Sequence, residues 1–310
     1  MAKKSKPDTV SGVIVINKHE GVTSFRIISI LKRMFDTPRV GHTGTLDPMA
    51  TGVLPVLLGR AVKASDYVMS YEKRYVAEIK FGIVTDTEDI TGEILESSDK
   101  LPEESDVISA AKSFIGEIMQ TPPMYSAIKI DGRKLVDIAR EGGTVERKAR
   151  PVVIHGIEVE KLSADTYRLD VTCSKGTYIR TLCADIGKVL GCGAVMSALT
   201  RVRTGNFTLD DAVNIEELEK MSFEERLKLP KPVETLFEEY PVLSLSQFHA
   251  KLFLDGAALY QKKIHANFED GQLIRVKYGD AFLGLGRAET GEDGIPKVRP
   301  EKLFMLTRPW

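Results

Sequence analysis

The sequence has little cysteine and no long apolar segment. Its 310 residues include only three cysteines, Cys173, Cys183 and Cys192, and none of them has CxxC spacing. An odd number of widely spaced thiols argues against a disulfide framework or a zinc site, so we expect buried free thiols. The apolar segments, such as Val53 to Leu58, are far shorter than the ~20 residues of a membrane helix. Because no apolar signal segment follows the first residues, we expect a cytoplasmic protein with no membrane partner.

The chain also lacks an excess of charge of either sign. It has 43 basic and 44 acidic side chains and a formal net charge of −1, which excludes a basic field over the whole molecule. Local segments differ, since residues 129–150 carry a net charge of +3 and residues 86–106 a net charge of −8. The basic segment is compatible with a nucleic-acid surface, and we expect the acidic one to be a solvated face.

Several common catalytic motifs are missing. The glycine pairs at 191–193 and 284–286 lack the third glycine of a dinucleotide fingerprint, and there is no GxxxxGK[ST] phosphate loop. No second histidine follows His19 at the spacing of a zinc hydrolase, and no GxSxG elbow occurs. We therefore expect an activity that needs no cofactor and no metal.

Hydrophobic periodicity predicts an α/β or α+β fold for the first part of the chain. The β-branched run from Val13 to Ile16 predicts a buried strand, and the helical spacing of apolar residues that follows predicts a helix capped by Thr23 or Ser24. Strict alternation over residues 73–81 predicts a half-buried strand that carries Tyr75 on its apolar face.

Later segments predict a second domain. Apolar spacing from Val107 to Ile118 indicates an amphipathic helix, and residues 215–239 have an acidic, helical pattern. After Glu238–Pro241 the sequence pattern changes to that of short strands separated by Gly and Asp. We therefore expect one domain over residues 1–238 and a small β-rich domain over residues 239–310.

Residues 41–52 form an unusually glycine-rich loop that carries one carboxylate, Asp47. Asp47 precedes a proline, so its backbone is held extended, and neighbouring glycines allow close approach to another group. Taken alone, a lone Asp-Pro favours a turn over a catalytic site. A second segment, residues 174–180, joins a strand to a helix that Thr177 is predicted to cap. Arg180 then lies in the first turn, where the helix dipole disfavours a cation, which suggests a carboxylate or phosphate partner.

Five segments, in this order, resemble the bacterial tRNA pseudouridine synthase B family. They are GHTGTLDP at 41–48, KRY at 73–75, TDTED at 85–89, PPMYSAIKIDGRKL at 122–135 and SKGTYIRTLCADIG at 174–187. The resemblance covers roughly residues 11–210, and the chain from about residue 241 resembles a PUA-type RNA-binding module. It implies a pseudouridine-synthase-type mixed β-sheet with flanking helices and an RNA-clamping insertion at about 122–150. The implied reaction isomerises the uridine at position 55 of the tRNA T-loop.

The resemblance also implies roles for individual residues. Asp47 falls on the catalytic aspartate, and Tyr75 on the tyrosine that stacks on the uracil and accepts the C5 proton. Arg180 falls on an arginine that pairs with Asp47, which would favour the ionised carboxylate. Residues expected to contact the displaced base or the RNA backbone are His42, Asp89, Tyr178, Leu199, Lys18 and Lys63. The adjacent acids Glu88 and Asp89 leave open which one organises the arginine.

Three other interpretations remain open. An aspartate-dependent glycosidase would need a second carboxylate across the bond and would release the base. A non-catalytic RNA-binding protein would need only the basic insertion and the C-terminal module. A guide-RNA-dependent relative shares GTLDP and GTYIR, although the insertion favours the stand-alone bacterial form. We expect tRNA as the only partner, no protein partner, a monomer, and an additional role in helping tRNA to fold.

Overall fold

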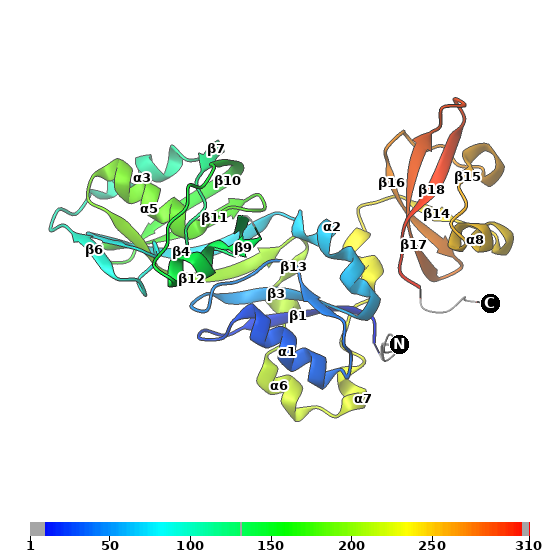
Figure 1. The fold of residues 1–310 in the computed structure, drawn as a ribbon, viewed down its shortest axis with the longest axis horizontal. Coiled ribbons are helices and arrows are strands. Elements are labelled where there is room, and N and C mark those ends of the chain that lie inside the picture. Colours follow the sequence, from blue (N-terminus) through cyan, green and yellow to red (C-terminus); the bar gives the residue numbers. More distant parts are fainter. Residues whose placement is uncertain (1–9, 131, 306–309) are drawn as a thin grey trace.

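The computed structural model describes residues 10–130, 132–305 and 310, and the fold is α+β, as predicted (Figure 1). Within these residues a nine-stranded sheet has the order β1-β3-β12-β4-β11-β10-β7, with β2 added to β3 and β13 added to β12. Its strands are β1 (Gly12–Lys18), β2 (Val40–His42), β3 (Thr51–Leu58), β4 (Lys73–Phe81), β7 (Gly116–Gln120), β10 (Arg150–Lys161), β11 (Thr166–Cys173), β12 (Ala194–Thr204) and β13 (Phe207–Thr208).

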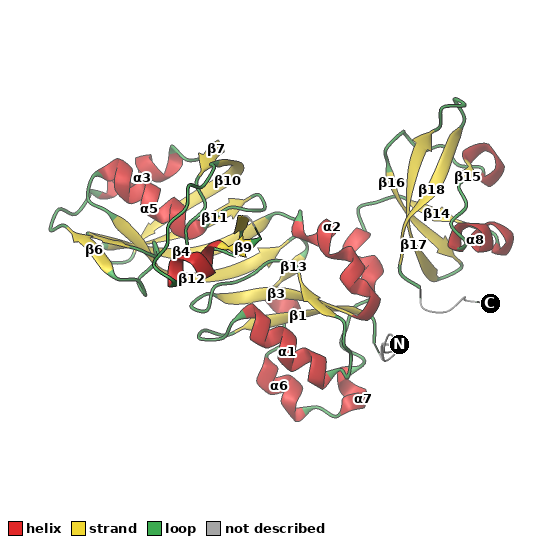
Figure 2. Cartoon of the chain, viewed as in Figure 1, coloured by secondary structure: helices red, strands yellow, loops and turns green. Residues whose placement is uncertain are grey.

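Helices flank this sheet (Figure 2). Helices α3 and α5 pack together against β10 and β12, and α6 packs against β1. The helices of this part are α1 (Ser24–Met34), α2 (Ser65–Met69), α3 (Glu104–Lys112), α5 (Ile179–Leu190), α6 (Ile215–Lys220) and α7 (Phe223–Arg226), with 3₁₀ turns η1 (Gly59–Ala64), η2 (Leu209–Asp211) and η3 (Val233–Phe237). The helical pattern at 215–239 is therefore divided among α6, α7 and η3.

The elements with the clearest periodicity form as predicted. Strand β1 is buried on both faces, because Ile14 and Ile16 enter one apolar core while Val13 and Val15 enter another. Strand β4 alternates over its whole length and buries Tyr75 with the other apolar residues of its inner face. Helix α1 begins after Thr23, whose side chain accepts a hydrogen bond from the Arg26 amide at 3.1 Å.

Three local predictions are wrong. Helix α3 ends at Lys112, and Ile118 lies instead in β7, an edge strand that pairs with β10 after a turn at Gly116 with φ +113°. The loop expected at 41–52 is shorter, because β2 includes His42 and β3 begins at Thr51. Thr177 does not cap α5: its hydroxyl donates to the Ser174 carbonyl, and Tyr178 occupies the N-cap position.

Two smaller segments extend from the sheet. Strands β5 (Ile83–Thr85) and β6 (Ile94–Ser97) form a hairpin beyond β4. The 122–150 segment contains β8 (Lys129–Ile130), β9 (Arg133–Lys134) and α4 (Leu135–Arg140). The dipeptide Asp131-Gly132, a sequence typical of a turn, falls in this segment, and Asp131 lies outside the described residues.

A second sheet begins at Val242 and has the order β14-β16-β17-β18-β15. Its elements are β14 (Val242–Ser244), α8 (Gln247–Leu254), β15 (Leu259–Tyr260), η4 (Gln261–Ile264), β16 (Leu273–Tyr278), β17 (Ala281–Thr290) and β18 (Pro296–Leu303). The Phe237 ring of η3 packs against Phe282 and Phe304 and thereby joins the two sheets. All three cysteines are buried free thiols, as predicted.

Candidate active site

The loop between β2 and β3 presents Asp47, and helix α1 fixes its backbone. The buried hydroxyl group of Ser24 accepts from the Leu46 amide at 2.9 Å and donates to the Leu46 carbonyl at 3.1 Å. The Ala50 amide closes the turn by donating to the Asp47 carbonyl at 3.0 Å. Because both flanks of Asp47 are anchored, its carboxyl group has a defined direction although it sits in a loop.

Arg180 meets this carboxyl group from the second residue of α5. Its Nε lies 3.0 Å from Asp47 Oδ2, so the ion pair expected between these two residues is present. Nη1 lies 3.6 Å from Asp89 Oδ2. The guanidinium also donates to the Thr87 carbonyl at 3.0 Å and to the Tyr125 carbonyl at 2.8 Å. Arg180 is only 5% exposed, and its partners account for a cation at a helix N-terminus.

Burial dominates the ionisation of Asp47. It raises the pKa of the carboxyl group above its ordinary value, whereas Arg180 lowers the pKa and Asp89 raises it further. The expectation that the ion pair would favour the ionised form holds for Arg180 alone, but the net direction is the opposite. The Asp47 side chain keeps 35% of its exposure, so it remains reachable from solvent.

Asp89, rather than Glu88, faces the arginine. Asp89 Oδ1 accepts from the hydroxyl groups of Thr87 at 2.9 Å and Thr91 at 2.6 Å, which leaves Oδ2 turned toward Arg180. Glu88 has φ +62° and directs its carboxyl group to the Thr181 hydroxyl at 2.5 Å. Burial raises the pKa of Glu88, and the hydrogen bond from Thr181 opposes this.

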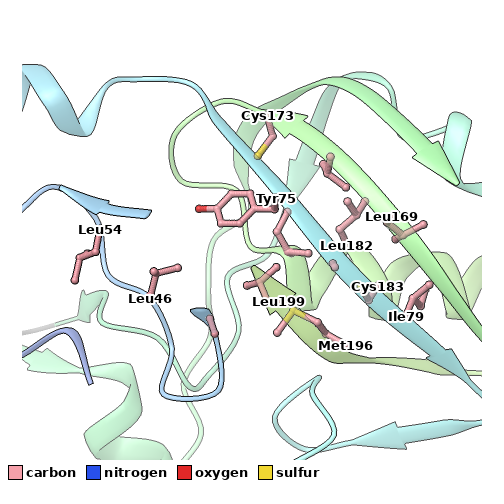
Figure 3. Packing of buried hydrophobic residues seen from close by; sticks show 14 of the residues in the cluster. Leu46, Leu54, Tyr75, Ile79, Leu169, Cys173, Leu182, Cys183, Met196 and Leu199 are labelled. Carbon is pink, nitrogen blue, oxygen red and sulfur yellow. The ribbon is translucent and has the colours of Figure 1, made fainter. Parts of the chain in front are cut away.

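Tyr75 and Leu199 lie on two neighbouring strands, β4 and β12. In Figure 3 the Tyr75 ring extends from β4 toward Leu46 and Leu54, with Leu199 of β12 close by. Both side chains are almost completely buried, Tyr75 at 9% and Leu199 at 8% exposure. Burial raises the pKa of the Tyr75 hydroxyl group, so this group is protonated at neutral pH. The two residues therefore offer an apolar surface beside the loop that carries Asp47.

Lys18, the last residue of β1, contacts the same loop. It is fully buried, and its Nζ donates to the His19 carbonyl at 3.0 Å and the Pro48 carbonyl at 3.1 Å. Burial lowers the pKa of Lys18 to about 8. The expectation that Lys18 contacts RNA phosphates is not supported by this geometry, because its ammonium group already binds the loop beside Asp47 and has no exposed surface.

His42 and Tyr178 lie at the borders of the cluster. His42 Nδ1 accepts from the Gly44 amide at 3.3 Å, and burial, with a smaller effect of Arg201, lowers the pKa of His42. Histidine at this position is therefore neutral at pH 7. Tyr178 is held at the start of α5 by Gln120, whose side chain accepts from its amide at 2.8 Å and donates to its carbonyl at 3.0 Å.

Lys63 lies outside this group of residues. It follows the last residue of β3, whereas the Asp47 loop precedes the first, and eight residues of strand span about 25 Å. Its Nζ donates to the Leu303 carbonyl of the second sheet at 3.1 Å, and the side chain is otherwise exposed. Lys63 is therefore not part of the group of residues around Asp47, and any RNA contact of Lys63 would lie outside that group.

Sequence reasoning missed Arg201 of β12, which is 1% exposed. Its Nε donates to the Val53 carbonyl at 2.7 Å and its Nη2 to the Gly44 carbonyl at 3.2 Å. Two-residue periodicity from Leu199 could have placed this arginine on the inward face of its strand. In the described part of the chain, no group of three or more His, Cys, Asp or Glu side chains is arranged to hold a metal ion, and no helix there is both long and apolar enough to cross a membrane.

Comparison with known proteins points to one family. Residues 32–179 match the TruB family pseudouridylate synthase (N terminal domain), and residues 180–238 match the tRNA pseudouridylate synthase B C-terminal domain. A tRNA pseudouridine synthase B of Clostridium tetani is 41% identical over 280 residues, covering 90% of this chain and 96% of the relative. One of Alkaliphilus oremlandii is 42% identical over 284 residues, covering 89% and 93%.

Among solved structures, a Cbf5-Nop10-Gar1 complex contains a chain with a TM-score of 0.71 and 26% identity, covering 98% of this chain and 92% of that one. Its fold therefore extends over both sheets of the present structure. The sequence identity over nearly full length, the two family domains and the cluster around Asp47 lead to one assignment: the chain belongs to the TruB family of pseudouridylate synthases.

Proposed function

We propose that this protein isomerises uridine to pseudouridine at position 55 in the T-loop of tRNA, with Asp47 as the catalytic residue. The observation that carries the proposal is the reachable Asp47 carboxyl group paired with Arg180, in a chain of the TruB family. The reaction breaks the N1–C1′ bond and forms a C5–C1′ bond. Since C5 loses one proton and N1 gains one, no external acid, base or redox partner is consumed.

The neighbours of Asp47 suit these steps. An ionised carboxylate can attack the base or the sugar, or remove a proton, and Arg180 supports the charged form against the effect of burial. The Tyr75 ring and Leu199 provide an apolar surface for a uracil removed from its stack. Asp89 holds the opposite side of the guanidinium and so restricts the direction in which Arg180 points.

Recognition of the RNA is assigned to three further parts. His42, which is bonded to Gly44 beside the Asp47 loop, would fill the space that the displaced base leaves. The segment 122–150, with its excess of basic residues, would clamp the folded T-loop through shape and phosphate contacts. We assign residues 1–238 to the catalytic domain and residues 239–310 to a PUA-like RNA-binding domain, because the latter has a separate sheet. Opening the T-loop would also help a misfolded tRNA to refold.

A tritium-release assay tests the proposal. The substrate is an in-vitro T-loop transcript labelled at uracil C5, supplied without guide RNA or protein partners. We expect the wild type to release tritium while the RNA keeps its mass, and Asp47→Asn to release none while its Kd for RNA stays unchanged. Asp99→Asn, an exposed aspartate outside the site, is the matched control and should keep full activity.

The assay also separates the alternatives. Release of free base would indicate a glycosidase. Activity that appears only when a guide RNA is added would indicate a guide-dependent enzyme. Binding without tritium release would indicate an RNA-binding protein, and an active Asp47→Asn protein would refute the role of the carboxylate.

A further inference from the structure

Arg201 is a buried cation that the proposed reaction leaves without a role. It is the largest of the fully buried side chains, and it takes part in none of the ion pairs formed among the described residues. Burying a guanidinium without a counter-ion is costly unless its donors are satisfied by well-placed acceptors. The acceptors that it uses therefore indicate what this residue holds in place.

The contacts of Arg201 involve three different elements. Strand pairing places Arg201 opposite Tyr75 of β4 on one side and Gly52 of β3 on the other. The guanidinium donates to the Val53 carbonyl of β3 at 2.7 Å and to the Gly44 carbonyl, in the loop that carries Asp47, at 3.2 Å. One side chain thus joins β3 to the Asp47 loop and lies opposite the Tyr75 position of β4.

Arg201 contacts the loop that carries Asp47 at Gly44. Its φ is +149°, and a Cβ added there would lie only 3.4 Å from Arg201 Nη1, so the loop backbone lies directly against the guanidinium. Asp47 follows three residues later, and its far side is anchored by the Ala50 amide, which donates to the Asp47 carbonyl at 3.0 Å. A change in the position of Arg201 would therefore alter both the packing beside Tyr75 on the neighbouring strand and the path of the loop.

We propose that Arg201 is a positioning residue that fixes the Tyr75 ring and its hydroxyl group relative to the Asp47 loop during uridine isomerisation. The inference rests on the proposed function. Arg201 is only 1% exposed, so its side chain is not accessible to a bound nucleoside. Its charge has a secondary effect, since it adds to the effect of burial in lowering the pKa of His42 and opposes the effect of burial on the pKa of Tyr75.

A double-mutant cycle tests the proposal. Arg201→Gln and Arg201→Lys are made in the wild type and in Tyr75→Phe, which keeps the ring but lacks the hydroxyl group. Single-turnover tritium release from a C5-labelled T-loop transcript gives the rate, and filter binding gives the Kd. In the wild-type background we expect Arg201→Gln to lower the rate by about 10²-fold, as a misplaced reacting group does, with an unchanged Kd. Arg201→Lys should recover part of this loss because the charge remains.

The second background decides whether Arg201 acts through Tyr75. In Tyr75→Phe we expect Arg201→Gln to cause only a small further loss of rate. An equal fold-loss in both backgrounds, or a weaker Kd, would overturn the proposal, as would failure of both Arg201 variants to fold, since Arg201 would then serve stability alone. Arg203→Gln, on the same strand but paired with Glu72, is the matched control. An active Asp47→Asn protein would instead refute the catalytic role of the carboxylate, without changing the measured coupling between Arg201 and Tyr75.

Discussion

Replacing Lys18 by methionine tests whether the side chain that binds the loop beside Asp47 is buried and has a lowered pKa in the folded protein. Burial lowers the pKa of Lys18 from 10.5 to about 8 in the folded protein, although Asp47 and Glu20 oppose the effect. Between these two pH values the unfolded chain binds a proton that the folded protein does not, so stability rises as the pH rises. At about 1.4 kcal/mol for each pKa unit, Lys18 contributes a rise of ~3 kcal/mol over this range.

The Lys18→Met variant removes this contribution together with the hydrogen bonds to the His19 and Pro48 carbonyls. Urea unfolding at a series of pH values from 8 to 10.5 gives the free energy of unfolding of both proteins. We expect the advantage of the wild type over the variant to grow by ~3 kcal/mol across the series. Lys100→Met, at an exposed lysine, is the control and should show a constant difference. A constant difference for Lys18→Met as well would refute the lowered pKa of Lys18 in the folded protein.

Four further expectations concern activity. Arg180→Lys should lower kcat by about 10²-fold with an unchanged Kd for RNA, because one ammonium group cannot reach two carboxylates and two carbonyls; a normal kcat would show that the guanidinium geometry is irrelevant. The pH profile of wild-type kcat should fall on the acid side at a pH above the ordinary carboxyl pKa of 3.8, since burial raises the pKa of Asp47 and only the ionised form reacts; a profile that is flat down to pH 4 would contradict this. Tyr75→Leu should reduce kcat more than RNA affinity, and a defect in affinity alone would disprove its place beside the base. Removal of residues 239–310 should weaken RNA binding and its salt dependence while saturating RNA restores turnover, so a folded but inactive truncation would reject separate domains.

Local patterns in the sequence were sufficient where one physical preference dominates. The alternation in β4 and the cap at Thr23 correctly predict elements that pack through their own periodicity. Arg180 was recognisable because a cation in the first turn of a helix is locally unfavourable and therefore needs a partner. The prediction for Ile118 failed because pairing with β10, a contact distant in sequence, overrides the helical spacing.

Burial was the property of the site least accessible from sequence. Lys18 and Arg201 read as ordinary basic residues, yet both are buried by strands that lie far apart along the chain. Lys63 matched a family position but lies at the opposite end of β3 from Asp47, which only the strand length reveals. The net direction of the Asp47 pKa likewise depends on how much protein surrounds the ion pair.

The hydrogen bond from Arg180 to the Tyr125 carbonyl ties the 122–150 segment to the reacting carboxyl group. An engineered chain break within that segment would therefore not lower RNA affinity alone, because the rate of the reaction would fall as well. If the peptide around Tyr125 were released, the guanidinium of Arg180 would lose one of its four acceptors. Turnover would then decline together with RNA affinity. A single side chain, Arg180, thus joins the segment that we propose to hold the RNA to the carboxyl group that we propose to react with it.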